Sequence, residues 1–366
     1  MTPAFALVRK AASTLLALSI VGMAPSYAAD DFKIGVYYFP GWKDNQLGAP
    51  FPMPWEKIKP YPEREPLLGW YREGEIPVME KQLEWMNQYG IDYVVFDWFW
   101  GRDNKSPLDH AINAYLRAKD RHNVQFAVMW TTHSDYVFSL EQLKAMFSFW
   151  ADRYAFRKEY LKMDGKPVVF IFSAVAFNRN AAKLGMTVAE LQALADQIFK
   201  DAGLAGVNFI GGVFNGEPGT DHSLKSGYRG FSSYNLHGPV SFRFAGGRQQ
   251  TRSYDELAQG YSDQWKWMLS HVEGNYVVPM FSGWDRRPWG GSPDPLHDKS
   301  IATPDQFEKH LEAARTVMLS APEKTQKMGV ICCWNEFGEG SFIEPTKQSG
   351  FSYLEKVKKV FGAQPK

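Results

Sequence analysis

The chain has 366 residues, with 41 Lys and Arg against 40 Asp and Glu, and a formal net charge of +1 at pH 7. A balance this close to zero offers no basic surface for nucleic acid or anionic lipid, so neither is expected as a partner. The length exceeds that of most domains with one core, but it is usual for an α/β barrel with insertions.

Residues 1–28 have the pattern of a secretory signal peptide. Arg9 and Lys10 precede the apolar stretch 11–23, and a cleavage site follows at Ser26-Tyr27-Ala28. A membrane anchor is the alternative, but the stretch is shorter than the ~20 residues that span a bilayer. We therefore expect a periplasmic or secreted protein without stable membrane insertion, whose residues 29–366 form a single domain. Cleavage would leave 41 − 2 = 39 basic residues against 40 acidic ones.

Short apolar runs alternate along the mature chain with longer amphipathic runs. The first strand is expected at 33–39, and the others begin near residues 91, 124, 168, 207, 231, 276 and 328. Helices are expected at 76–89, 107–120, 140–153, 187–202, 254–271 and 304–319, and only a short helix near 221–226 fits the fifth crossover. Eight strands joined by helical crossovers predict a (β/α)8 TIM barrel.

The longest irregular segments all follow expected strands rather than helices. They cover residues 39–74, 215–229, 236–253 and 282–303. In a barrel the segments that follow strands meet at the carboxyl-end face, where active sites are built. We therefore expect the functional site at this face.

Polar and aromatic side chains gather at the expected carboxyl ends of the strands. The residues predicted to bind substrate are Tyr38, Asp97, Trp98, Trp130, His133, Asn215, Tyr234, His237, Trp284, Asp285, Asn335 and Glu344. Carboxylates and amides suit sugar hydroxyls, and aromatic rings suit the C–H faces of sugars. The expected partner is thus a polysaccharide or oligosaccharide. For Asp97, a structural role as acceptor for backbone amides stays equally open.

The most informative stretch is 334–345, Trp-Asn-Glu-Phe-Gly-Glu-Gly-Ser-Phe-Ile-Glu-Pro, which follows the apolar run 328–333. Glycoside cleavage needs one carboxyl group to protonate the leaving oxygen and a second group to act at the anomeric carbon. Glu336 and Glu339 meet that need and are the predicted catalytic pair. Their spacing allows a separation of about 5 to 6 Å in a helical turn or about 10 Å in an extended chain.

Other chemistries find little support in the sequence. The adjacent Cys332 and Cys333 would point to opposite faces of a strand, so we expect packing residues rather than a disulfide or a metal site. The pattern His-Glu-x-x-His, paired Cys-x-x-Cys motifs and phosphate-binding glycine loops are not present. We expect neither a metal nor a nucleotide cofactor.

Six arginines in the last three of these long segments leave two interpretations open. They are Arg229, Arg243, Arg248, Arg252, Arg286 and Arg287. Recognition of acidic sugars is one interpretation, and solvent-exposed charge is the other.

The terminal motif resembles that of the glycoside hydrolase family 99-like proteins, including their WbsX-like branch. Further matching pieces are Gly-Val-Tyr-Tyr-Phe-Pro at 35–40, Tyr-Gly-Ile-Asp at 89–92, Asp-Trp-Phe-Trp at 97–100 and Gly-Trp-Asp-Arg-Arg-Pro at 283–288. The resemblance spans nearly the whole mature chain. It implies a (β/α)8 barrel and, from the characterised members, a retaining endo-α-mannosidase chemistry without metal.

The resemblance also implies roles for the three glutamates. Glu336 would act as a base on the 2-hydroxyl of the substrate, forming an anhydro-sugar intermediate, and Glu339 would serve as general acid and then base. Glu344 would support the sugar pocket. The mannosidases carry Trp-His between the two catalytic glutamates, where this chain has Phe337-Gly338.

We therefore expect an exported, endo-acting and retaining glycoside hydrolase that cleaves a polysaccharide or glycan. A noncatalytic carbohydrate-binding protein and a transglycosylase of an exopolysaccharide system are the alternatives. New reducing ends would separate the hydrolase from the binding protein, and redistribution of chain lengths would indicate the transglycosylase.

Overall fold

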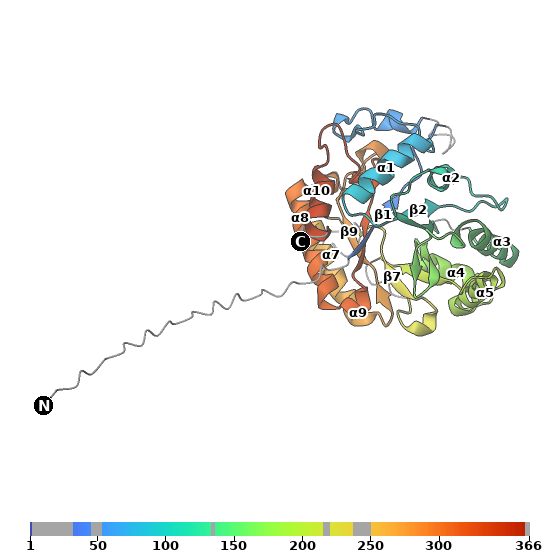
Figure 1. Ribbon diagram of the computed structural model, residues 1–366. Helices are drawn as coiled ribbons and strands as arrows, with labels where there is room; N and C mark the ends of the chain where they lie inside the picture. The colour runs from blue at the N-terminus through green and yellow to red at the C-terminus, as the bar shows by residue number, and fades with distance from the viewer. Residues whose placement is uncertain (2–31, 45–52, 133–135, 215–219, 237–249, 363–366) are drawn as a thin grey trace. The chain divides into compact units, whose positions relative to one another are not determined.

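A computed structural model describes residue 1 and residues 32–44, 53–132, 136–214, 220–236 and 250–362. Its central sheet is a ring of parallel strands with helices outside it (Figure 1). The strands are β1 (Lys33–Tyr38), β2 (Tyr93–Trp98), β3 (Gln125–Trp130), β5 (Lys166–Ile171), β6 (Asn208–Gly212), β7 (Gly230–Ser232), β8 (Asn275–Tyr276), β9 (Val278–Phe281) and β12 (Met328–Cys332). Each of the eight expected strands has its counterpart among them.

The ring closes through the segment Asn275–Phe281. Its first half, β8, pairs with β7, and its second half, β9, pairs with β12; only Val277 separates the two halves. β12 in turn pairs with β1, with Lys33 opposite Met328. The segment therefore acts as one strand of the ring, and the predicted (β/α)8 barrel is confirmed.

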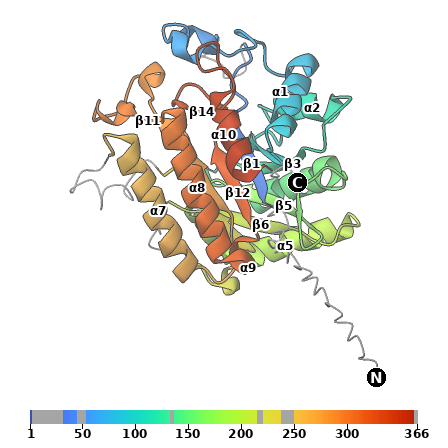
Figure 2. The same cartoon turned by 60° about the vertical axis from the view of Figure 1, so that its left-hand side comes forward.

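The helices bury one face each against this ring. They are α1 (Ile76–Gln88), α2 (His110–Arg117), α3 (Leu140–Trp150), α4 (Ala174–Lys183), α5 (Val188–Asp201), α7 (Tyr254–His271), α8 (Pro304–Ser320), α9 (Pro322–Thr325) and α10 (Ser352–Phe361). Figure 2 shows α7, α8 and α10 side by side outside β12. In α7 the buried Leu257, Tyr261, Trp265 and Met268 recur every three to four residues, as a helix with one apolar face requires.

The helix expected at 107–120 is shorter in the structure, because α2 begins at His110 and ends at Arg117. Three further helices, α4, α9 and α10, have no counterpart among the expected ones. The helix expected at 187–202 is present as α5 and begins with a capping box, in which Glu190 N donates to Thr187 Oγ1 over 3.2 Å.

The barrel interior is filled by large side chains set against small ones. The Tyr93 ring lies over Gly35, where a Cβ atom would come within 2.2 Å of the ring, and its hydroxyl donates to the carbonyl of Gly329 over 2.8 Å. Higher in the ring, Tyr37 contacts the rings of Phe170 and Tyr234. The interior is therefore a packed core, so the chemistry must take place at one end of the ring.

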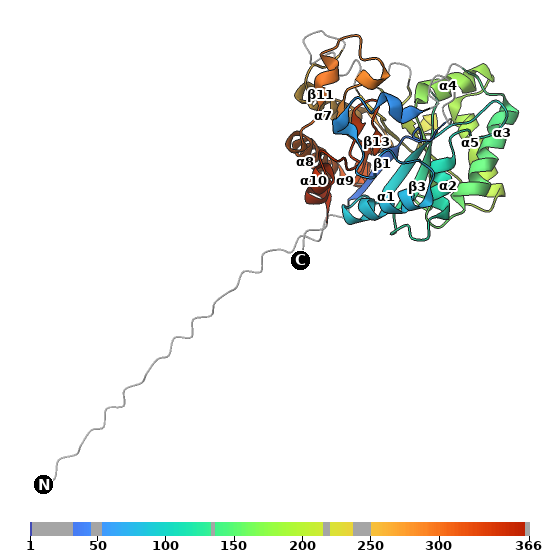
Figure 3. The same cartoon turned by 90° about the horizontal axis from the view of Figure 1, so that it is seen from above.

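Short elements lie at the carboxyl end of the ring. Four of them are the paired strands β10 (Gly283–Trp284) and β11 (Ser300–Ile301), and the strands of the hairpin, β13 (Asn335–Glu336) and β14 (Ser341–Phe342). Figures 2 and 3 show the segments 53–74 and 285–301 gathered at this same end. The remaining strand, β4 (Lys162–Met163), pairs with β5 in the antiparallel sense.

The expectation for the two cysteines is wrong. Cys332 and Cys333 form a disulfide across a cis peptide bond. The prediction assumed a regular strand through both residues, but β12 ends at Cys332, so the alternation of faces does not extend to Cys333. Both residues are fully buried.

Within the described ranges, no helix has both the length and the apolar character to cross a membrane.

Candidate active site

The terminal motif folds as a tight hairpin directly after β12. Trp334 N donates to the carbonyl of Tyr37 over 2.7 Å, which continues the pairing of the barrel strands by one step. The chain then turns, and Glu344 N donates back to the carbonyl of Trp334 over 2.8 Å. The motif is therefore held at both ends by the barrel itself.

The hairpin brings the two predicted catalytic residues close together. Glu339 N donates to the carbonyl of Glu336 over 3.2 Å, so residues 336–339 form a turn. The Cα atoms at the ends of such a turn lie within roughly 7 Å of each other. Of the two spacings that the sequence allowed, the structure has the compact one.

Glu336 is connected to Asp97 through a single tyrosine. The Tyr234 hydroxyl lies 3.0 Å from Glu336 Oε1 and 2.9 Å from Asp97 Oδ2. Asp97 lies near the carboxyl end of β2, Tyr234 follows β7 and Glu336 follows β12, and all three side chains are buried. The carboxyl ends of the strands therefore meet as the barrel fold predicts.

A single hydroxyl hydrogen, that of Tyr234, lies between the carboxyl groups of Glu336 and Asp97. A tyrosine hydroxyl has a single hydrogen, so it donates to one carboxylate while the other carboxyl group, when protonated, donates to it. Burial raises the pKa of Asp97 well above its ordinary value. Burial, followed by the charges of Glu339 and Asp97, does the same to the pKa of Glu336. The second oxygen of Asp97, Oδ1, is buried without a partner in the part of the chain that is described.

Glu339 has a different environment. Its side chain is partly exposed at the hairpin turn, and Asn235 Nδ2 donates to it over 3.5 Å. Burial raises the pKa of Glu339 to about 7, and the positive charge of Arg286 opposes that rise. Glu339 is thus a carboxyl group that is still substantially protonated near neutral pH.

Glu344 lies behind the hairpin in a separate polar cluster. Tyr71 donates to Glu344 Oε2 over 2.9 Å, and Gln82 Nε2 donates to Glu344 Oε1 over 3.2 Å. The hydroxyl of Tyr38 donates to Gln82 Oε1 over 3.1 Å. Burial raises the pKa of Glu344 to about 8. Because Tyr38 and Glu344 are both buried, they stabilise the walls of the site.

Asn335 joins the hairpin to the first long loop. Its side chain accepts from Phe39 N over 2.9 Å and donates to the carbonyl of Phe39 over 3.0 Å. Its amide also lies 3.3 Å from Glu73 Oε1, and its backbone carbonyl accepts from Trp42 Nε1 over 2.8 Å. Asn335 is fully buried, so its amide positions the neighbouring Glu336 rather than facing a ligand.

The Phe337-Gly338 pair is explained by aromatic packing. Phe337 is buried in a second apolar cluster with Trp42, Trp55 and Tyr71 of the first loop. Trp289 covers Gly338, where a Cβ atom would come within 1.8 Å of the indole Nε1. A side chain at position 338 is therefore incompatible with this arrangement of Trp289.

The model of the family described as glycosyltransferase WbsX matches residues 60–357, which is most of the chain. The chain belongs to the WbsX family. No curated protein matches it. The resemblance seen in the sequence motifs is thereby confirmed.

Solved structures similar to this WbsX-family chain share its fold. A glycoside hydrolase-like protein is 16% identical, with a TM-score of 0.63 and coverage of 92% of this chain and 96% of its own. The GH99 endo-α-mannosidase of Bacteroides thetaiotaomicron is 14% identical, with a TM-score of 0.62 and coverage of 89% and 95%. A GH5_18 protein of Streptomyces cattleya, solved with GlcNAc, is 11% identical, with a TM-score of 0.52 and coverage of 92% and 82%.

Several of the residues predicted to bind substrate in this WbsX-family chain contact protein groups instead. Trp98 packs between Trp100 and Trp150, and Trp130 packs against Phe177; both indoles are buried. Trp284 is also buried, and its Nε1 donates to Ser292 Oγ over 3.0 Å. His133, Asn215 and His237 lie outside the described residues, so their predicted role stays a prediction.

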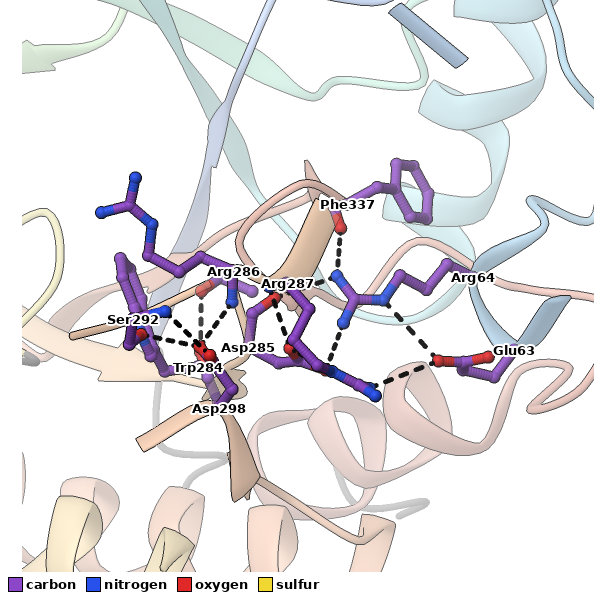
Figure 4. Close-up of polar contacts among 11 residues, drawn as sticks. Glu63, Arg64, Trp284, Asp285, Arg286, Arg287, Ser292, Asp298 and Phe337 are labelled. Carbon is purple, nitrogen blue, oxygen red and sulfur yellow. Dashed lines mark hydrogen bonds and ion pairs between the residues drawn. The ribbon is translucent and has the colours of Figure 1, made fainter. Parts of the chain in front are cut away.

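Asp285 is the centre of a buried charge cluster (Figure 4). Arg64 forms an ion pair with its carboxylate, and Arg287 donates to both of its oxygens over 2.8 and 2.6 Å. Arg64 also donates to the carbonyls of Asp285 and Phe337, over 3.0 and 2.6 Å. The cluster therefore fixes the hairpin, and the predicted contact of Asp285 with substrate is replaced by this anchoring role.

Sequence reasoning missed two buried charged residues, Arg64 and Glu73. Glu73 accepts from Trp42 N over 2.9 Å and lies 2.8 Å from His110 Nε2. Both residues come from the irregular segment 39–74, where periodicity gives no signal of burial. Among the described residues, no group of three or more His, Cys, Asp or Glu is placed to hold a metal ion.

We expect Asp285→Ala to lower the free energy of unfolding by about 3 kcal/mol or more, because it leaves the buried Arg64 guanidinium without its counter-charge. The control is Asp294→Ala, whose partner Arg252 is much more exposed; its loss should be about 1 kcal/mol or less. Urea denaturation of both variants measures the difference. Equal losses would show that the Asp285 cluster does not anchor the hairpin.

Proposed function

We propose that this protein is a glycoside hydrolase that cleaves bonds within a polysaccharide or glycan with retention of configuration. The observation that carries the proposal is the pair Glu336 and Glu339 in one tight turn, with different surroundings. Glu336 is buried and bonded to Tyr234, whereas Glu339 is partly exposed and has a pKa of about 7. Two carboxyl groups in different environments suit one acid and one base.

In the proposed reaction Glu339 is the general acid. Its proton passes to the glycosidic oxygen as the bond from that oxygen to the anomeric carbon breaks. The compact turn supports the short carboxyl separation of about 5 Å typical of retaining enzymes, rather than the longer gap that holds a water molecule in inverting ones.

Glu336 is the proposed base. In the chemistry implied by the family resemblance, Glu336 removes the proton of the 2-hydroxyl, and that oxygen attacks the anomeric carbon to form an anhydro sugar. Glu339, now ionised, takes a proton from water as the water oxygen attacks the anomeric carbon, and protonated Glu336 returns its proton to the 2-oxygen as that oxygen leaves the anomeric carbon. Two inversions at the anomeric carbon leave the configuration unchanged.

Tyr234 and Asp97 serve this base. A hydrogen bond from Tyr234 stabilises the ionised form of Glu336. When Glu336 is ionised, a proton is held on the Asp97 carboxyl group, on the other side of Tyr234. The arrangement lets the proton shift through the tyrosine from one carboxyl group to the other without leaving the site.

Mannose is not part of the proposal. The solved relative from Bacteroides thetaiotaomicron is named an endo-α-mannosidase, but its resemblance to this chain is one of fold. Phe337 is buried in this structure and Gly338 lies under Trp289, so neither can act as the mannosidase Trp-His pair does. The surface that this chain offers to a sugar at Phe337 and Gly338 therefore differs from that of the mannosidases.

A transfer reaction is the second candidate, because the family is described as a glycosyltransferase. The same intermediate yields hydrolysis when water opens it and transfer when a sugar hydroxyl does. A glycan panel separates these cases. Shorter products with new reducing ends support hydrolysis, redistributed chain lengths support transglycosylation, and binding without new reducing ends supports a noncatalytic protein.

We expect Glu336→Gln and Glu339→Gln each to lower kcat/KM by about 10²- to 10⁴-fold, because each removes a group that must exchange a proton. Glu65→Gln is the matched control, since Glu65 forms an exposed ion pair with Lys347 and should leave activity near that of the unaltered protein. Reducing-end release measures all three. Activity close to normal in either catalytic variant would contradict the assignment.

We expect activity to fall as the pH rises through about 7, because Glu339 must be protonated to act as acid. On the acid side of the pH profile, activity should rise as Glu336 loses its proton. Tyr234→Phe should move this rise to higher pH, because the lost hydrogen bond had lowered the pKa of Glu336. The control is Tyr228→Phe, whose hydroxyl contacts Asn178 instead. A rising limb unchanged in Tyr234→Phe would contradict the role of Glu336 as base.

We also propose that the protein is exported, on the strength of the leader pattern in residues 1–28. Expression of the full chain in a bacterium with two membranes should give a periplasmic or secreted product whose N-terminal sequence begins near residue 29. Recovery of uncleaved protein in the cytoplasm or membrane fraction would overturn this proposal.

A further inference from the structure

Four of the six arginines in the long segments lie in the described part of the chain, and three of them have carboxylate partners. Arg229 donates to Asp164 over 2.6 Å, Arg252 to Asp294 over 2.7 Å, and Arg287 to Asp285 over 2.6 Å. Arg286 differs, because no ion pair joins it to any described residue. Arg286 can therefore decide between the two interpretations of these arginines, recognition of acidic sugars and solvent-exposed charge.

The backbone of Arg286 is held firmly. Its N–H donates to Asp298 Oδ1 over 3.0 Å, and its carbonyl accepts from Trp289 N over 2.8 Å and from Gly291 N over 3.0 Å. Figure 4 shows the Arg286 side chain extending away from the Asp285 cluster, whose carboxylate is already bound by Arg64 and Arg287. Backbone hydrogen bonds thus hold Arg286 in place, and no ion pair of its guanidinium with a described residue contributes.

The guanidinium of Arg286 is only partly exposed, and its Nε is buried without a hydrogen-bond partner among the described residues. A buried donor without a partner costs free energy that a ligand can recover. A guanidinium offers paired donors with the geometry of a carboxylate. The group is therefore prepared for an anion that none of the described residues supplies.

Arg286 is also close to the catalytic turn. The preceding residue, Asp285, donates from its N–H to the carbonyl of Glu339 over 2.7 Å, and the charge of Arg286 acts on the Glu339 carboxyl. In the reacting form of the enzyme Glu339 is protonated and carries no charge. Arg286 then has no charged partner at Glu339, and an anionic group on the substrate would provide one.

We propose that Arg286 binds a carboxylate of the substrate glycan in the part of the site next to Glu339, so that the enzyme acts on acidic polysaccharides. This inference rests on the proposed hydrolase function. The carboxylate would come from a uronic acid or from a pyruvyl ketal, since both present the same planar anion to a guanidinium.

The competing account is that Arg286 only adjusts the acidity of Glu339. The two accounts differ in what a neutral substrate would show. If Arg286 only adjusts Glu339, its replacement lowers activity on acidic and neutral forms of a polymer by the same factor. If it binds a carboxylate, its replacement selectively affects the acidic form.

The test compares Arg286→Gln, Arg286→Lys and the control Arg252→Gln on acidic bacterial exopolysaccharides. Each polymer is used untreated, after chemical reduction of its carboxyl groups, and after mild acid removal of pyruvyl ketals alone. We expect Arg286→Gln to lose about 10- to 100-fold in kcat/KM on the untreated polymer, the range of a charged hydrogen bond, and less than about 3-fold on the reduced polymer. Arg286→Lys should lose less than Arg286→Gln, and Arg252→Gln should lose little on either.

Activity that survives ketal removal but falls on carboxyl reduction identifies a uronic acid, and activity lost at ketal removal identifies the ketal. Equal losses for Arg286→Gln on untreated and reduced polymer would overturn the proposal, as would faster cleavage of the reduced polymer by the unaltered enzyme. If no polymer is cleaved, the hydrolase proposal fails separately. Calorimetric binding of glucuronic acid oligosaccharides and their carboxyl-reduced forms then decides the role of Arg286, and equal affinity for both would overturn it.

Discussion

The guanidinium of Arg64 is the contact on which the rest of the site depends. It reaches from the first loop to the carboxylate and carbonyl of Asp285 in the seventh loop and to the carbonyl of Phe337 in the hairpin. One buried cation thus fixes three segments that are far apart in the sequence. Because the buried carbonyls of Asp285 and Phe337 would lose their donor without Arg64, the three segments are held in register together.

The same loop also positions the acidic residues. Asn335 is bonded to the backbone of Phe39 and to Glu73, and the neighbouring Glu336 thereby faces Tyr234 and Asp97. Burial of several carboxyl groups within one barrel end raises their pKa values and retains protons there. A site assembled in this way is prepared for proton transfer before any substrate arrives.

The sequence predicts the barrel and the position of the acidic motif because both leave a local signal. Apolar runs such as Met328–Cys332 mark buried strands, and Glu336 and Glu339 closely follow the last of these runs. The turn that joins the two glutamates depends on the hydrogen bond from Glu339 N to the Glu336 carbonyl, which their spacing alone does not predict. The supporting residues leave no such signal. Arg64 and Glu73 are charged residues of an irregular loop, and their burial depends on partners more than 200 residues away, Asp285 and Asn335. Cys333 was misjudged for a related reason, since the end of a strand is a tertiary property.

The indole that covers Gly338 comes from outside the acidic motif. In the mannosidase pattern the side chains between the two motif glutamates belong to the motif itself, whereas here Trp289 from a different loop occupies that space. The chemical character of the surface beside Glu336 and Glu339 is thereby encoded by a segment other than the one that carries them. Under the proposed function, exchange of the segment around Trp289 would change the surface offered to a sugar and leave the proposed acid and base in place.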